Sequence, residues 1–421
     1  MQTWLIEPRD PLIVRDGRPF SADIAGARAA SLAFPFPSTT AGAVRTRYGR
    51  TKGGDFNETL IADVKRKRIH GPLLVELDDR GAVADWLLAA PADTSWVACD
   101  PGGRVASLRR LAPLALPDGA KTNLPADLTL VGTQQLIEGK PFDHPPRYWR
   151  WESFQQWLLH PADHDEVDLE TWGHPGPPGE TRVHVGIQPG DQGKPSPLTA
   201  IEGALYQTRG LEFIHLPPPQ HSSPSKPLSA ARRLALAIST DADGLVEGIA
   251  PLGGERRLVC WRENRNSKVD LLGDKPLTEL KHLIVEKVVQ NRACRLILLT
   301  PAHFSEGFLP TSLKAASPGV GVNVRAVAMN RPQVVSGWDL DRRHGVRKEG
   351  RPKPTRRLAP AGSVYFLEFD AVSDAALRSW IERVWLRSVS DDDSEQDRDQ
   401  TRLDGFGLAI LGVSERIEVK R

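Results

Sequence analysis

Hydroxyl and arginine side chains gather near the start of the chain, between residues 34 and 49. The side chains that could bind an anion there are Ser38, Thr39, Arg45 and Arg47. We expect Ser38 or Thr39 to cap a helix over residues 41–48, which Gly49 would end in the left-handed conformation. A helix start with free N–H groups, hydroxyls and nearby arginines is suited to a phosphate. The alternative is an ordinary capped helix with exposed arginines.

Two glycines flank an aromatic residue near the end of the chain, at Gly405, Phe406 and Gly407. A strand is expected to follow, over residues 407–411. Glycines at such a turn let backbone N–H groups approach a phosphate or a sugar, because no side chain stands in the way. Many β-turns share this pattern, so on its own it also fits a turn that binds no ligand.

A strongly basic stretch spans residues 325–357, with ten lysines and arginines against three acidic residues. Trp338 lies within it, and Arg356 and Arg357 lie at its end. Guanidinium groups beside an indole can hold phosphates while a base stacks on the ring. This segregation of charge favours a surface that faces a polyanion. A solvated basic loop is the alternative.

Composition excludes several other classes of protein. The chain has 421 residues, of which 40% are hydrophobic, and a net charge of +2, as expected for a soluble chain of two or three domains. No apolar run is long enough for a membrane helix, and the first residues do not resemble a secretory signal, so we expect neither a membrane nor a secreted protein. The three cysteines lie far apart and fit neither disulfides nor a zinc site, so we expect a reducing, cytoplasmic setting. Residues 160–166, which are rich in histidine and acid, are interpreted as a solvated loop, so no metal or other cofactor is expected.

Hydrophobic periodicity predicts a mixed α+β fold in two halves, residues 1–245 and 246–421. The second half is expected to open with a short strand over residues 258–261. Next come a helix after Pro276, strands over residues 294–300, 322–329 and 363–369, and a helix capped by Ser373. This order is that of the split βαβ unit of ferredoxin-like folds. The first half permits the same interpretation, with the helix over residues 41–48 and strands over residues 3–7, 73–77 and 232–240.

Several of these segments resemble one known family. Residues 7–20 and 34–46 are similar to the start of the Cmr-type third subunit of type III-B CRISPR effector complexes. That subunit belongs to the RAMP (repeat-associated mysterious protein) superfamily. Residues 253–257, 336–339 and 405–408 follow in the order that the family shows, and residues 183–213 resemble its protruding hairpin.

The resemblance implies two ferredoxin-like (RRM-like βαββαβ) halves with long insertions, a protruding β-hairpin, and no catalysis by the subunit itself. It implies a subunit that holds the 5′ repeat-derived tag of the guide RNA, docks on the large palm-domain subunit and contacts neighbouring RAMP backbone subunits. Tyr206 would belong to a thumb-like hairpin, and the glycines would let the backbone approach the RNA. Carried over to this sequence, the candidate RNA contacts are Arg15, Arg18, Ser38, Thr39, Arg45, Arg47, Tyr206, Trp338, Arg356, Arg357, Gly405, Phe406 and Gly407.

A RAMP-type endoribonuclease that matures the guide-RNA precursor is the rival hypothesis. Metal-independent cleavage of RNA needs a general base and a general acid beside a 2′-hydroxyl. The first histidine of the chain is His70, which follows a basic run and is expected in a loop. A nucleotide cyclase, suggested by Gly253, Gly254 and Glu255, would need paired metal carboxylates that are not evident. A scaffold that binds RNA without cleaving it therefore fits the sequence better.

Overall fold

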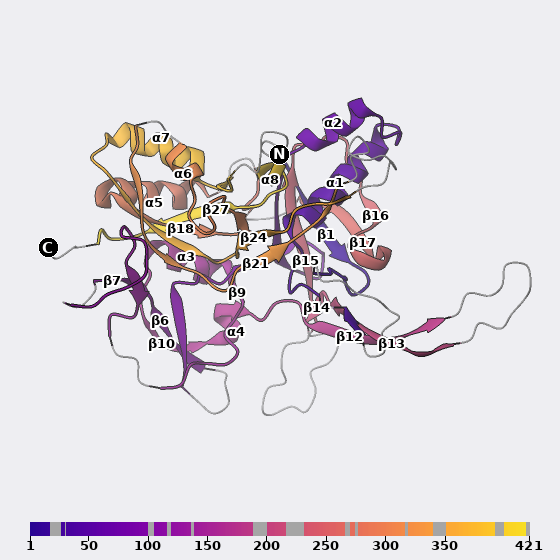
Figure 1. Cartoon of the computed structure of the whole chain (residues 1–421), viewed down its shortest axis with the longest axis horizontal. Coiled ribbons are helices and arrows are strands. Elements are labelled where there is room, and N and C mark those ends of the chain that lie inside the picture. The colour runs from indigo at the N-terminus through magenta and orange to yellow at the C-terminus, as the bar shows by residue number, and fades with distance from the viewer. Residues whose placement is uncertain are drawn as a thin grey trace, which may run out of the picture.

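The computed structural model shows a mixed α+β chain built on several sheets whose strands are mostly antiparallel (Figure 1). A long hairpin projects from the body of the molecule in that view. Among the described residues, no helix has the length and apolar character needed to cross a membrane. The structure describes residues 1–16, 27–29, 31–99, 105–115, 119–135, 139–187, 200–215, 231–265, 270–273, 277–315, 319–339, 351–391 and 400–417.

The N-terminal half is built on a nine-stranded sheet of order β11–β9–β4–β3–β15–β1–β17–β16, with β14 paired to β15. Neighbouring strands run antiparallel throughout. Its strands are β1 (Gln2–Pro8), β3 (Ile69–Leu77), β4 (Val83–Ala89), β9 (Tyr148–Arg150), β11 (Gly173–His174), β14 (Ile214–His215), β15 (Arg232–Thr240), β16 (Gly248–Pro251) and β17 (Leu258–Glu263).

Two helices between β1 and β3 cover one face of this sheet, α1 (Pro37–Thr51) and α2 (Glu58–Arg66). Ala41 and Val44 of α1 pack with Leu74 of β3 in one core, whereas Leu73 and Val75 point into a second core on the opposite face. Successive side chains of a strand alternate between faces, so β3 supplies both cores and is buried along its whole length.

A large insertion between β3 and β15 builds several further elements. These are β5 (Thr94–Ala98), β6 (Val105–Arg110), β7 (Ala112–Leu114), β8 (Leu130–Gly132), α3 (Trp151–Leu159), β10 (His164–Asp168) and α4 (Leu169–Trp172). The insertion ends in the projecting hairpin of β12 (Gly179–Ile187) and β13 (Ala200–Leu211). A short strand, β2 (Ala27–Ala29), pairs with β13 in parallel. The predicted hairpin is confirmed by the antiparallel register of β12 and β13.

The C-terminal half is built on a five-stranded sheet of order β20–β25–β18–β27–β26. Side chains of α7 pack into its core, and Ser373 caps that helix by accepting a hydrogen bond from the backbone N–H of Ala376, as predicted. The elements of this sheet and its helices are α5 (Thr278–Asn291), β18 (Ala293–Leu298), α6 (Ser312–Ala315), β20 (Val322–Ala328), β25 (Val364–Phe369), α7 (Asp374–Val384), β26 (Arg387–Ser388), α8 (Gln400–Leu403) and β27 (Leu408–Val413).

The basic stretch leaves the C-terminal sheet between β20 and β25. Its described part forms short strands: β21 (Gln333–Val335), β22 (Trp338–Asp339), β23 (Arg351–Pro352) and β24 (Arg356–Ala359). β24 pairs with β21 and with β19 (Ala302–His303), so the two ends of the basic stretch are joined in one small sheet.

A fully buried ion pair joins the insertion to the C-terminal sheet. Arg295 Nη1 donates to Asp93 Oδ2 at 2.6 Å, and both side chains are 0% exposed. Trp157 Nε1 of α3 donates to the other carboxylate oxygen at 3.0 Å, and Arg295 Nε donates to the carbonyl oxygen of Val413 at 2.9 Å. Removing either charge would leave its partner buried without compensation.

Most predicted elements are confirmed, and three predictions need correction. The strand expected to open the second half is β17, which pairs with β1 and so belongs to the N-terminal sheet. His70 lies in β3 and is 7% exposed, so it is not a loop residue. His164 lies in strand β10, not in a solvated loop. Pro276, expected at a helix start, lies outside the described residues.

Candidate nucleic-acid interface

Helix α1 begins with a proline instead of a hydroxyl cap. Pro37 occupies the first helical position, where its missing N–H costs no hydrogen bond and its fixed φ favours the helix. Phe36 is the N-cap residue and makes no side-chain cap. The prediction that Ser38 or Thr39 caps this helix is therefore wrong. Both side chains are half-buried within the first turn.

The end of α1 also differs from the prediction. The helix continues past Gly49 to Thr51, and Gly53 and Gly54 adopt the positive φ that was expected of Gly49. A Cβ on Gly49 would lie 2.5 Å from the ring of Phe56, an exposed side chain that has room to move aside. The two additional helical residues include Arg50, which is exposed.

The turn at Gly405 and Gly407 serves the protein's own packing. A Cβ on Gly405 would lie 2.8 Å from the carbonyl oxygen of Ile69, and one on Gly407 would lie 2.7 Å from the backbone nitrogen of Ser390. The backbone N–H groups of Gly405, Phe406 and Gly407 all donate to carbonyl oxygens of the chain. In this structure these three N–H groups are thus occupied by acceptors within the chain.

The start of α1 and the Gly405 turn meet through two aromatic rings. The ring centroids of Phe36 and Phe406 lie 6.4 Å apart. Val335 of β21 and Leu358 of β24 complete this small core. The guanidinium of Arg356 lies over the Phe406 ring, 5.9 Å from its centroid. Three segments that are distant in the sequence, each singled out for its possible chemistry, therefore converge at one place.

Arg45 reinforces this contact with an ion pair. Its Nη1 lies 2.5 Å from Asp404 Oδ1, and the two side chains are only 14% and 13% exposed. Arg45 also donates to the backbone carbonyls of Val64 and Lys67. These contacts direct its guanidinium into the junction between the two halves and away from solvent.

A basic groove, here called the helix groove, lies between α1 and the β16–β17 connection and has a volume of about 330 Å³. Arg47 donates to the carbonyl oxygen of Val246 and lies 5.5 Å from the centroid of the Trp261 ring. Burial lowers the pKa of Arg47, although the group remains a cation. Polar and cationic side chains that line this groove are Thr39, Thr46, Arg47, Arg50 and Arg256.

A second groove, here called the junction groove, runs between the two halves and has a volume of about 650 Å³. Phe36 and Pro37 line it, so the first turn of α1 separates the two grooves. Burial raises the pKa of Tyr148 to about 12, so its phenol stays protonated. Aromatic and cationic side chains that line the junction groove include Phe34, Trp96, Arg147, Tyr148 and Arg331. An elongated polyanion with planar bases fits such a lining.

Among the described residues, the remaining predicted RNA contacts lie outside the helix groove and the junction groove. Arg15 is exposed and its backbone bridges to Ser31. Tyr206 lies on the projecting hairpin, where its ring stacks on His184 with centroids 5.1 Å apart. Arg357 is exposed on β24, and the backbone of Trp338 pairs with that of Pro352. Arg18 lies outside the described residues.

Four cations of the two grooves are not among the individual contacts predicted from the sequence, although Arg331 lies within the predicted basic stretch: Arg50, Arg147, Arg256 and Arg331. Arg50 follows Arg47 by three residues, a helical spacing that places both on one face. Arg256 lies within the Gly-Gly-Glu-Arg-Arg segment, where Gly253 has φ +72° and packs on the carbonyl oxygen of Ile13. In the part of the chain that the structure describes, no three histidine, cysteine or acidic residues are placed to hold a metal ion.

Comparisons with known proteins point to one family. A family model described as "CRISPR-associated protein (Cas_Cmr3)" matches residues 4–414. Among solved structures, a chain of the type III-B Cmr-beta complex bound to cognate target RNA and AMPPnP is 18% identical, with 86% of each chain covered and a TM-score of 0.41. A chain of the Csm3–Csm4 subcomplex of the type III-A CRISPR-Cas interference complex is 10% identical. That match covers 88% of this chain and 100% of the other, with a TM-score of 0.32. No curated protein matches this sequence.

Proposed function

Because this chain belongs to the Cas_Cmr3 family of CRISPR-associated proteins, we propose that it is a non-catalytic RNA-binding subunit of a type III-B CRISPR effector complex. In this proposal it holds the 5′ repeat-derived tag of the guide RNA. It docks on the large palm-domain subunit, beside neighbouring RAMP backbone subunits. Its own side chains position the strand and neutralise phosphates, and they break no bond.

One observation carries the proposal, namely the contact between the start of α1 and the Gly405 turn. Phe36 and Phe406 pack together there, and Arg45 pairs with Asp404. This contact places the helix groove and the junction groove on either side of one helical turn. A strand that crosses this turn would meet arginines on one side and both arginines and aromatic rings on the other.

The two grooves would play different parts in holding the strand. Arg47, Arg50 and Arg256 would neutralise phosphates in the helix groove, with the Thr39 hydroxyl as a further hydrogen-bond donor. In the junction groove, Phe34 offers a ring to a base, and Arg147 and Arg331 supply charge. Single-stranded RNA is recognised in this way, through stacked bases and neutralised phosphates.

The family-derived contacts then divide into two groups. Arg15, Ser38, Thr39, Arg47 and Arg357 are proposed to contact RNA directly, and Arg18 and Trp338 remain proposed contacts. The second group is proposed to shape the site from within, because its members are occupied by contacts inside the protein: Arg45, Arg356, Gly405, Phe406 and Gly407.

We also propose that each half is a ferredoxin-like unit. In the N-terminal sheet, β15 lies between β1 and β3, the two strands that α1 and α2 connect, and β17 lies on the other side of β1. In the C-terminal sheet, β25 lies between β18 and β20 in the same manner, and β27 lies beside β18. This is the strand order of the split βαβ unit. The hairpin β12–β13 is then the proposed thumb, with Tyr206 on one of its strands.

RNA recovered with the protein tests this function. The full chain is purified from cells that express the guide-RNA array and the complex, and the bound RNA is sequenced. We expect the recovered RNAs to share one 5′ end that begins in the repeat. A population with scattered 5′ ends would contradict tag recognition. In EDTA, the same protein is expected to leave labelled repeat RNA uncleaved, and specific cleavage would contradict the non-catalytic role.

A further inference from the structure

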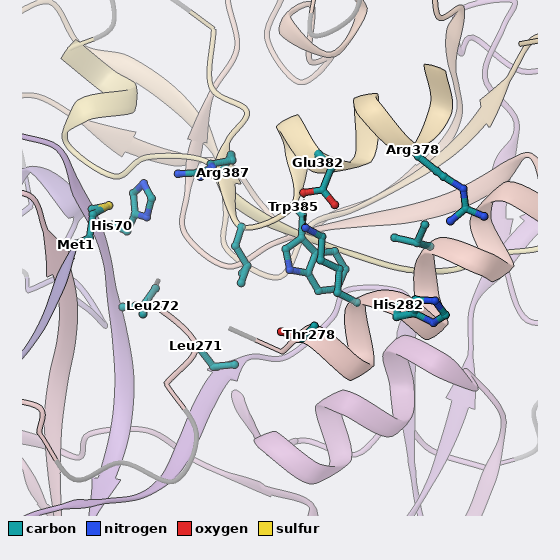
Figure 2. Close-up of a pocket in the computed structure, with 14 residues that line it drawn as sticks. Met1, His70, Leu271, Leu272, Thr278, His282, Arg378, Glu382, Trp385 and Arg387 are labelled. Atoms are coloured by element: carbon teal, nitrogen blue, oxygen red, sulfur yellow. Dashed lines mark hydrogen bonds and ion pairs between the residues drawn. The ribbon is translucent and has the colours of Figure 1, made fainter. Parts of the chain in front are cut away.

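A third cavity opens between the two halves and has a volume of about 580 Å³ (Figure 2). It is here called the inter-half pocket. Strand β3 contributes His70 from the N-terminal half, whereas α5 and the α7–β26 region supply the other wall. Its apolar lining comes from Leu271, Leu272, Val285 and Leu386. A cavity of this size with apolar walls and a few polar groups is typical of a small-molecule site.

A buried donor without a partner lines the inter-half pocket. Trp385 is 5% exposed, and its indole Nε1–H has no hydrogen-bond partner among the described residues. A buried N–H that makes no hydrogen bond costs about 1–3 kcal/mol, so such groups are uncommon in native proteins. An acceptor brought by a ligand would remove this cost.

The start of α5 adds further donors beside Trp385. Thr278, the first residue of this 14-residue helix, lines the pocket, and Figure 2 shows it below Trp385. The N-cap residue, Leu277, has φ +60° and no side chain able to cap the helix. The first backbone N–H groups of a helix have no intrahelical acceptor and carry partial positive charge, which favours an anion.

Arg387 supplies a full positive charge to the same cavity. Its side chain is exposed, and no carboxylate of the described residues pairs with it. In Figure 2 its guanidinium points toward His70, which is 7% exposed. Burial, followed by the nearby charges of Arg387 and Arg68, lowers the pKa of His70 to about 4. The imidazole is therefore neutral at pH 7 and can donate one hydrogen bond without adding charge.

The other ionisable side chains that line the pocket already contact a partner, and Met1, the N-terminal residue, lines it as well. Lys281 Nζ lies 2.5 Å from Glu382 Oε2. Arg378 makes two hydrogen bonds, of 2.8 and 2.9 Å, with the carboxylate of Glu286. His282 lies 3.8 Å from the same carboxylate. Arg387 is thus a side-chain cation of this lining that pairs with no carboxylate of the described residues, and Trp385 and the first residue of α5 line the same cavity.

We propose that the inter-half pocket binds a phosphate monoester carried by a small organic group, with Arg387, the Trp385 N–H and the start of α5 around the phosphate. The apolar residues Leu271 and Leu272 would contact the organic part. A phosphate dianion offers three acceptor oxygens and pairs well with guanidinium, whereas a neutral ligand would leave Arg387 without a counter-charge. This inference does not depend on the RNA-binding function proposed above.

Calorimetric titration of the purified full chain tests the inference, with AMP, inorganic phosphate and adenosine as probes. AMP is expected to bind, inorganic phosphate to bind more weakly, and adenosine to bind at least tenfold more weakly than AMP. Arg387→Gln should weaken AMP binding by roughly tenfold or more, because it removes a charge-assisted contact. Trp385→Phe keeps most of the ring, removes the N–H, and should weaken binding by roughly fivefold.

Arg378→Gln is the matched control, because Arg378 lines the same pocket but is held by Glu286. It should leave AMP affinity unchanged. The inference is overturned if AMP does not bind, if adenosine binds as tightly as AMP, or if Arg387→Gln binds AMP like the wild type. Arg387 is exposed, so its variant keeps the test valid even if Trp385→Phe fails to fold.

Competition identifies the source of the phosphate. A short RNA with a 5′-phosphate and the same RNA with a 5′-hydroxyl are added to the AMP complex. Displacement by the phosphorylated RNA alone assigns the pocket to a strand end. If neither RNA displaces AMP, the pocket is assigned to a free nucleotide. Equal displacement by both RNAs would contradict recognition of a monoester.

Discussion

Arg45 and Asp404 form an ion pair of 2.5 Å although they are 359 residues apart in the sequence. The pair joins helix α1 of the N-terminal half to the turn that precedes the last strand of the C-terminal half. Phe36 and Phe406 pack nearby. A segment that sequence patterns mark as a phosphate site is thereby fixed against a glycine-rich turn, and two grooves open beside it.

Breaking this pair should loosen the junction. Asp404→Asn is expected to lower the free energy of unfolding by about 2 kcal/mol, because Arg45 would remain partly buried without its counter-charge. Urea unfolding followed by circular dichroism measures the change. Glu180→Gln is the control, because Glu180 forms an exposed pair with Arg182 on the hairpin. An Asp404→Asn variant as stable as this control would contradict a structural role for the pair.

The buried pair of Arg295 and Asp93 should matter more for stability. Arg295→Met is expected to cost about 3–5 kcal/mol, because Asp93 would stay fully buried as an unpaired charge. The double variant Arg295→Met/Asp93→Leu should recover part of this loss, since it removes both charges. Thermal unfolding compares the two. If the single variant were no less stable than the double variant, the carboxylate would not be the source of the cost.

Acid should destabilise the fold through two buried histidines. Burial is the largest cause that lowers the pKa of His70 to about 4 and that of His174 to about 3. Between these values and about 6.5, the unfolded chain binds protons that the folded chain does not, so stability falls as the pH decreases below 6.5. From pH 7.5 to pH 5, the loss is expected to reach about 2 kcal/mol for each histidine.

Urea unfolding at a series of pH values measures this dependence. A His70→Asn/His174→Asn variant should show a shallower slope between pH 7.5 and pH 5 than the wild type. Equal loss of stability in both proteins over this range would contradict a role for the two buried histidines.

The hairpin should contribute to RNA binding through the Tyr206 ring. Tyr206 stacks on His184, with an angle of 14° between the rings. Tyr206→Ala is expected to weaken binding of the guide RNA by roughly tenfold, since stacking of a base on an aromatic ring contributes about 1–3 kcal/mol. Tyr206→Phe retains the ring and should bind like the wild type. Gel-shift titration compares them, and equal affinity of the alanine variant would exclude base stacking on Tyr206.

Local sequence patterns predict the helices and strands of this chain better than they predict its tertiary contacts. The cap at Ser373 and the buried stripe of α7 follow from helical spacing, and the strand over residues 232–240 matches β15 residue for residue. These features depend on neighbours within a few positions. At α1, the same reasoning favoured a hydroxyl cap, whereas the proline at the first helical position begins the helix.

Tertiary contacts give several predicted site residues a role inside the protein that differs from the role expected from the sequence. Nothing near Arg45 in the sequence indicates a partner at Asp404, so local spacing alone predicts that the Arg45 guanidinium is available to RNA. Gly405 and Gly407 were expected to make room for a ligand, but the space is taken by β3 and by Ser390. Arg50 and Arg256 share one groove only because α1 packs beside the β16–β17 connection. Such convergence is a property of the fold and is not visible in local spacing.

RNA affinity of the Arg50→Gln/Arg256→Gln variant tests the central claim most directly. Both arginines line the helix groove and are exposed, so the fold should survive. Lys287→Gln on α5, far from α1 in Figure 1, is the single-charge control. Fluorescence anisotropy with labelled 5′-tag RNA is recorded over a range of salt concentrations. We predict at least a tenfold loss of affinity, and a slope of log K against log salt reduced by about 1.4 for two lost phosphate contacts. Affinity and salt slope equal to those of Lys287→Gln would contradict binding of the strand beside α1.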